Sequence, residues 1–122
     1  MQHQRCRTFR GAGALTAFTA VKMTTAVSGE ETVTVAGDGD LAIGILQEDV
    51  VAAGDSANVC VAGESFALAN AAITVGVLVQ SVASTGKIGA AAATEYVFGY
   101  ALEAADAQDN KIKVWITGPA TM

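Results

Sequence analysis

The chain has 122 residues, of which 52% are hydrophobic and 16% are charged, and its formal net charge is −5. This composition excludes a disordered, highly charged chain and limits the sequence to one small domain. Because aromatic residues make up only 6%, the core must be built mainly from Ala and Val, so we expect self-association or docking on a larger partner to complete its stability.

The N-terminal segment differs in charge from the rest of the chain. Arg5, Arg7 and Arg10 precede any acidic residue, whereas all twelve acids lie beyond residue 22. We predict a flexible or extended arm over residues 1–13, which is either a solvated terminus or a contact for an acidic protein surface or a nucleic acid. The acidic body argues against a nucleic-acid-binding domain. No apolar run approaches the roughly 18 residues of a spanning helix, so we expect no membrane partner.

Alternation of apolar and polar residues with a period of two dominates the remaining sequence and predicts β-strands. Glycine-containing turns separate the alternating runs at intervals of about 8–12 residues, which is the spacing of a β-sandwich or barrel. We therefore predict an all-β fold, a small sandwich or barrel of about 7–9 short strands in a single domain over residues 14–118, followed by a C-terminal tail over 119–122. The predicted strands cover residues 15–21, 32–35, 41–46, 75–80, 96–102 and 111–117.

The last predicted strand carries the clearest candidate interface. Ile112, Val114 and Ile116 share one face of this strand, and Lys111, Lys113 and Trp115 share the other. An aromatic residue on a polar face is often an interface anchor. The alternative is that both faces of the strand are covered within one sandwich.

The sequence contains no recognisable catalytic, cofactor-binding or metal-binding pattern. His3 is the only histidine, so no Ser-His-Asp or Cys-His arrangement can be assembled. Cys6 and Cys60 have neither disulfide-framework nor zinc spacing, and they indicate a chain kept in a reducing compartment. Asp38 and Asp40 are interpreted as turn residues, with a weak cation site as the alternative. We therefore predict no enzymatic activity, cofactor or metal.

Lys22 offers a second alternative. The segment Ala20-Val21-Lys22-Met23 is similar to the lysine-methionine motif of biotinyl carrier domains, which are small all-β folds. In that family the lysine lies on a hairpin near the middle of the domain. Here only 21 residues precede Lys22 and Val21 replaces the expected methionine, so carriage of a group is the less favoured interpretation.

Two longer segments, residues 35–63 and 74–117, together resemble bacteriophage capsid decoration proteins, also called cement proteins. The resemblance lies in small-residue strands and turns rather than in a catalytic signature. Its motifs are Leu41-Ala42-Ile43-Gly44-Ile45-Leu46, Ala52-Ala53-Gly54-Asp55, Val59-Cys60-Val61-Ala62-Gly63, Gly76-Val77-Leu78-Val79, Ser84-Thr85-Gly86-Lys87, Phe98-Gly99-Tyr100-Ala101-Leu102-Glu103-Ala104-Ala105 and Lys111-Ile112-Lys113-Val114-Trp115-Ile116.

The resemblance implies a virion protein on the capsid exterior, made in the host bacterial cytoplasm. Such a protein binds the outer surface of an icosahedral head and stabilises the lattice of the major capsid protein, often as a homotrimer at local threefold positions. On this hypothesis Arg5, Arg7 and Arg10 contact the capsid or a neighbouring copy, and Trp115, Lys111 and Lys113 form a subunit or capsid interface. The alternative is another phage tail or appendage structural module.

Overall fold

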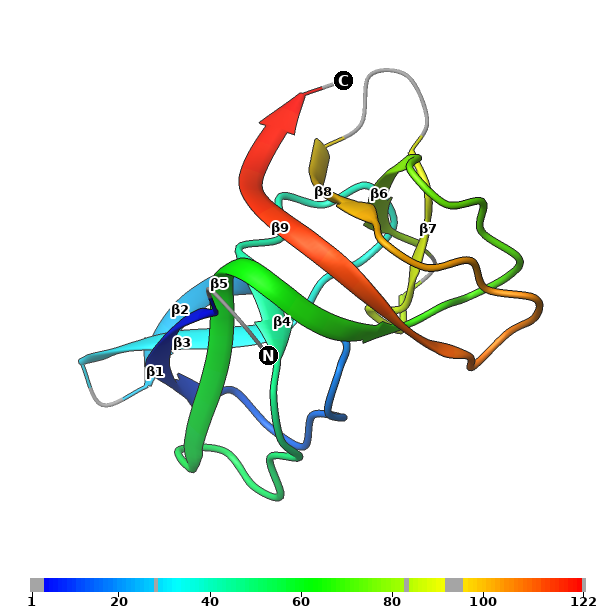
Figure 1. The fold of residues 1–122 in the computed structure, drawn as a ribbon. Helices are drawn as coiled ribbons and strands as arrows, with labels where there is room; N and C mark the ends of the chain where they lie inside the picture. Colours follow the sequence, from blue (N-terminus) through cyan, green and yellow to red (C-terminus); the bar gives the residue numbers. More distant parts are fainter. Residues whose placement is uncertain (1–3, 28, 83, 92–95, 122) are drawn as a thin grey trace.

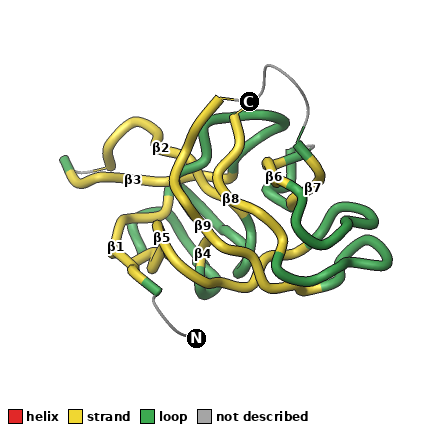
Figure 2. Tube along the Cα trace, turned by 45° about the horizontal axis from the view of Figure 1, so that its top comes forward, coloured by secondary structure: helices red, strands yellow, loops and turns green. Residues whose placement is uncertain are grey.

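The computed structural model describes residues 4–27, 29–82, 84–91 and 96–121, and this part of the chain forms nine β-strands and no helix (Figures 1 and 2). The strands follow one another in a single hydrogen-bonded order, β1-β3-β2-β4-β5-β9-β8-β6-β7. Their bounds are β1 Arg5–Gly11, β2 Ala20–Val27, β3 Glu30–Val35, β4 Gly44–Leu46, β5 Ser56–Leu68, β6 Leu78–Ser81, β7 Ile88–Ala90, β8 Tyr96–Ala101 and β9 Lys111–Thr121.

The first five strands close into a barrel. Strand β1 pairs in parallel with β3 and antiparallel with β5. Because β1 and β5 stand at opposite ends of the order β1-β3-β2-β4-β5, their pairing closes the barrel. The other four strands form a second sheet beside this barrel (Figure 1). The predicted all-β barrel or sandwich with 7–9 strands is therefore confirmed.

Strand β5 belongs to both parts of the fold. Its first half pairs with β1 and β4 in the barrel, and its second half, from Gly63 to Leu68, pairs with β9 in the second sheet. Gly63 stands at this change of partner with a φ of +91°, in the left-handed region where a side chain is disfavoured. A glycine at this position therefore lets one long strand bend from the barrel into the second sheet, as Figure 1 shows.

The barrel wall is buried on both faces where β4 and β5 pack against the second sheet, and two clusters of apolar side chains result. Neighbouring residues of one strand alternate between them: Leu46 and Val59 lie in the barrel interior, whereas Ile45 and Cys60 lie in the layer between the barrel and the second sheet. The interior cluster comprises Phe9, Val21, Val33, Leu46, Val50, Ala57 and Val59. The interlayer cluster is larger and includes Phe98, Ile88, Val114 and Ile116.

The chain ends differ from the sequence prediction. Residues 5–11 form β1, with Phe9 only 4% exposed in the barrel interior, so this part of the predicted arm is an integral strand of the domain. The arginines of this segment give it no apolar pattern, and its burial depends on pairing with the distant β5. Strand β9 likewise continues to Thr121, well into the predicted tail. Residues 1–3 and 122 lie outside the described part of the chain.

The alternating runs located most strands and misplaced some boundaries. The runs at 32–35, 96–102 and 111–117 coincide closely with β3, β8 and β9. The run at 15–21 becomes a strand only from Ala20, because Phe18 adopts a positive φ of 64° in a turn. In the described part of the chain, no helix is long and apolar enough to cross a membrane.

Candidate functional site

The outward face of the second sheet presents a row of large side chains. The strand register aligns Leu78 of β6, Tyr100 of β8, Trp115 of β9 and Glu64 of β5 across four adjacent strands. Residues directly opposite one another in an antiparallel sheet project from the same face. Leu78 is 42% exposed, and Tyr100 and Trp115 are partly exposed. We call Leu78, Tyr100 and Trp115 the aromatic row.

The opposite face of the same strands is buried. Ile112, Val114 and Ile116 are at most 3% exposed and belong to the interlayer cluster. The alternation predicted for β9 is therefore correct. Trp115 and Lys113 on the other face of β9 are partly accessible, and the assignment of this face to an interface stays a prediction.

A basic and aromatic cluster continues the aromatic row toward the start of β9. The Lys111 ammonium lies 5.0 Å from the ring centroids of both Phe18 and Phe66, a distance at which cation–π attraction operates. The two rings meet edge to face, with centroids 6.1 Å apart. Lys113 lies opposite Phe66 in the ladder between β9 and β5. The three predicted interface residues, Lys111, Lys113 and Trp115, thus share one face, and Lys111 is held in place by aromatic rings.

The three N-terminal arginines lie on β1, at a distance along the chain from this sheet. Arg7 donates a hydrogen bond of 2.8 Å to the Glu31 carboxylate, in an ion pair in which both side chains are more than half exposed. Its guanidinium also lies 4.9 Å from the centre of the Phe9 ring. Arg5 is exposed at the start of the strand. The arginines are therefore presented by a folded strand rather than by a mobile arm.

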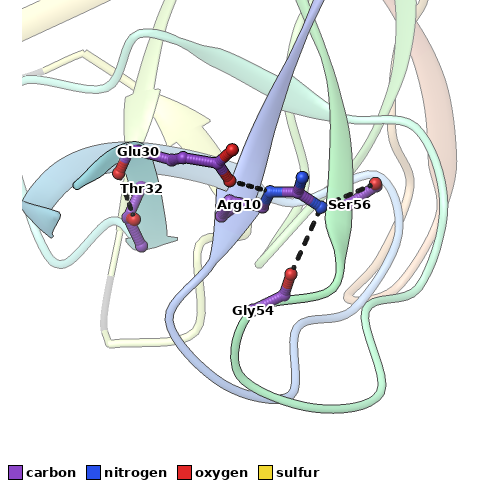
Figure 3. Close-up of polar contacts among 5 residues, drawn as sticks. All are labelled: Arg10, Glu30, Thr32, Gly54 and Ser56. Carbon is purple, nitrogen blue, oxygen red and sulfur yellow. Dashed lines mark hydrogen bonds and ion pairs between the residues drawn. The ribbon is translucent and has the colours of Figure 1, made fainter. Parts of the chain in front are cut away.

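Arg10 is occupied at the seam that closes the barrel (Figure 3). Its Nε donates to the Glu30 carboxylate at the start of β3. Its Nη1 donates to the Gly54 carbonyl, at 3.4 Å, and to the hydroxyl of Ser56 at the start of β5, at 3.3 Å. The hydrogen bond between Arg10 and Glu30 raises the pKa of Arg10 and lowers the pKa of Glu30. Arg10 thus links the two strands that flank β1.

Lys22 lies in the middle of a strand. It sits within β2, opposite Thr34 of β3, and its ammonium donates to the Asp40 carboxylate at 2.7 Å. The Lys22 hydrogen bond, together with one from the Gly37 backbone, lowers the pKa of Asp40. A carrier lysine must project from a hairpin to reach distant sites, so this placement does not favour the carrier alternative. Asp40 is a turn acceptor here, and the described residues contain no cluster of three or more metal-ligating side chains.

Sequence reasoning identified one strand of this surface and missed its neighbours. Phe18, Phe66, Tyr100 and Leu78 were not singled out, because their proximity to Trp115 and Lys111 depends on strand register. The alternation within residues 75–80 and 96–102 was the available signal. It assigns Leu78 to one face of its own strand and Tyr100 to one face of its own strand. Only the pairing of β6, β8, β9 and β5 shows that these faces are the same face.

The fold matches that of a known phage structure. The crystal structure of the N base of the head fiber gp8.5 of bacteriophage phi29 superimposes with a TM-score of 0.76, covering 93% of this chain and 94% of that chain. The sequences are 17% identical, so this likeness shows the shared fold. No curated protein sequence matches the chain.

The family comparison covers most of the sequence. The family model of the phage cement protein matches residues 12–116, from the end of β1 to the buried part of β9. This range includes the second sheet with its aromatic row. Membership implies a virion component that binds a phage capsid, and it points to a structural rather than an enzymatic role. The chain belongs to the phage cement protein family.

Proposed function

We propose that this protein binds the outer surface of an icosahedral phage head and stabilises the lattice of the major capsid protein, as a homotrimer at local threefold positions. The observation that carries the proposal is the outward aromatic row beside Lys111 and Lys113. Trp and Tyr are the residue types most enriched among binding hot spots, since they bury large areas at a small cost in side-chain entropy.

The charge pattern of this surface indicates the chemistry of the partner. Lys111 and Lys113 lie on one side of Trp115 along β9, and Glu64 lies opposite Trp115 on β5, while the protein as a whole carries a net charge of −5. A capsid surface with an apolar recess and with acidic residues facing the two lysines is complementary to this face. Arg5 and Arg7, exposed on β1, are proposed as a second basic contact to the capsid or to a neighbouring copy.

Stabilisation of the lattice follows from binding alone. A ligand that binds the assembled state and not the dissociated state stabilises assembly by mass action. Contacts repeated by linked copies add through effective concentration, so a modest contact per subunit is sufficient. No chemical step is required, in agreement with the structural character of the family.

The substitution Trp115→Ser tests the proposal. We expect it to weaken binding to purified heads that lack the protein by at least about thirty-fold, because truncating a hot-spot residue costs about 2 kcal/mol or more. Occupancy is measured by sedimentation of heads with increasing amounts of added protein. Val51→Ser is the matched control, since Val51 is 81% exposed in the connection between β4 and β5.

Equal occupancy by wild type and the Trp115 variant would contradict the assignment of this surface, provided that both proteins unfold at the same temperature. Heat treatment of the loaded heads then tests stabilisation directly. Heads saturated with wild type should release their DNA at a higher temperature than bare heads. An unchanged release temperature would contradict the cement mechanism even where binding occurs.

The alternative is a structural module of a tail or other appendage. Its support is the shared fold with the base of a head fiber. Fractionated virions distinguish the two: a cement protein is found on heads in many copies, whereas an appendage subunit is found in few copies at one location. Immunogold labelling of intact particles provides the measurement.

A further inference from the structure

Two cysteines that are far apart in the sequence lie directly opposite each other in the barrel. Cys6 of β1 is the ladder partner of Cys60 of β5, next to the irregularity between Arg5 and Cys6. Both thiols are free in this structure. Their juxtaposition is a product of the fold, because it depends on β1 closing the barrel against β5.

The hydrogen-bond pattern places the two cysteines at a close-spaced position of the ladder. The Gly11 N–H donates to the Asp55 carbonyl at 2.9 Å, which marks the adjacent pair, Arg10 and Ser56, as a non-hydrogen-bonded pair. The pattern repeats every two residues, so Cys6 and Cys60 form such a pair as well. Their Cα atoms are then about 4.5 Å apart, within the range of about 4.4–6.8 Å that disulfides require.

The side chains of the pair share one face of the wall. Cys60 is fully buried in the interlayer cluster, and Cys6 is a partly buried residue packed against the same cluster. Burial raises the pKa of the Cys60 thiol to about 11, and the neighbouring Cys6 adds to this shift. Cys6 is therefore the sulfur that a reagent reaches first, and Cys60 is a slow partner that is already in position.

We propose that Cys6 and Cys60 are a site of oxidative cross-linking, at which a small disulfide oxidant such as oxidised glutathione joins β1 to β5. The Cys6 thiolate attacks one sulfur of the oxidant and expels a glutathione thiolate, which takes up a proton. Cys60 then loses its proton, attacks the Cys6 sulfur and expels the second glutathione. The protein loses two electrons and two protons, and both are recovered in two molecules of reduced glutathione.

The cross-link fixes the seam of the barrel. It ties the strand that closes the array to the strand that connects barrel and second sheet. Because it closes a long loop in the unfolded chain, we expect the melting temperature to rise by on the order of 10 °C. A virion that leaves a reducing cytoplasm for an oxidising medium meets the required oxidant. The inference does not depend on where the protein binds the capsid.

Oxidation of the purified full-length chain tests the proposal. Reduced protein is incubated with oxidised glutathione until its mass is constant. We expect the intact mass to fall by two hydrogens without a glutathione adduct, free thiols to fall from two per chain to none, and peptide mapping without reductant to join Cys6 to Cys60. The melting temperature should rise, and a reductant should reverse all four changes.

The variant Cys6→Ser is the control, because it retains β1 but leaves the buried Cys60 without a partner. Its melting temperature should not respond to the oxidant. Three outcomes would overturn the proposal: a lasting glutathione adduct on Cys6 with Cys60 still free, cross-links only between chains, or two unreacted thiols in folded wild-type protein. Each is read from the wild-type mass spectrum, so the test does not depend on the folding of the variant.

Discussion

Gly99 is required by its neighbour across the sheet rather than by its own backbone conformation. An ideal Cβ built on Gly99 would lie 2.1 Å from the Trp115 carbonyl oxygen, far inside contact distance. Because this obstacle is backbone, the substitution Gly99→Ala must move β8 away from β9. We expect the free energy of unfolding to fall by about 1–3 kcal/mol, as overpacking does in other cores. Urea denaturation followed by circular dichroism measures this loss.

Gly13→Ala provides the matched control for this prediction. A Cβ on Gly13 would meet no atom within 4 Å. The control should leave stability within about 0.5 kcal/mol of wild type or raise it slightly, since alanine restricts the unfolded chain. Equal midpoints for Gly99→Ala and Gly13→Ala would show that the β8–β9 contact is looser than described.

At the scale of elements, β1 decides whether the barrel is closed. Deleting residues 1–11 removes Phe9 from the interior and leaves the β1-facing edges of β3 and β5 unpaired, although β3 keeps its pairing with β2 and β5 keeps its pairings with β4 and β9. Loss of a buried Phe side chain alone costs about 3–5 kcal/mol, a large part of the 5–15 kcal/mol that stabilises a typical domain. We expect the truncated chain to lose its cooperative thermal transition, measured by circular dichroism and calorimetry.

A charge variant separates the structural role of β1 from its proposed contact with the capsid. Replacing Arg5 and Arg7 by Gln retains the strand and the Arg10 contacts, and the ion pair that Arg7 forms with Glu31 is solvent-exposed and screened by salt. This double variant should keep a cooperative transition and bind heads less tightly than wild type. A folded double variant with full head occupancy would contradict a capsid contact by these arginines. A cooperative transition in the truncated chain would contradict the closing role of β1.

The elements also show how far local sequence signals extend. Strands β3, β8 and β9 were predictable because each has one buried and one accessible face, so polarity alternates along the chain. Strand β1 was not, since its arginines face solvent and only Phe9 and Gly11 are buried, by partners far along the chain. Lys111, Lys113 and Trp115 were found from one strand, whereas Phe66 and Tyr100 required the register between strands.

At the scale of the whole molecule, the second sheet buries one face against the barrel and leaves the aromatic row on its other face accessible. Its cores are assembled largely from Ala, Val and Ile, with Phe9 and Phe98 as the only buried aromatic residues among those described. Small side chains bury little area each, so we expect association to contribute a proportionally larger share of stability. This balance supports the proposed homotrimer and leaves one question: whether the aromatic row faces a neighbouring copy or the capsid.

Light scattering coupled to size exclusion answers this question with one pair of proteins. Wild type at micromolar concentration is expected to elute with the mass of three chains of 12.3 kDa each. If the aromatic row is the subunit interface, Trp115→Ser yields monomers, because loss of a hot-spot anchor raises the dissociation constant at least about thirty-fold. If the row faces the capsid, the variant remains trimeric and loses only head binding. A wild-type monomer at this concentration would contradict the trimer and restrict self-association to the capsid surface, where the lattice raises the local concentration of the chain.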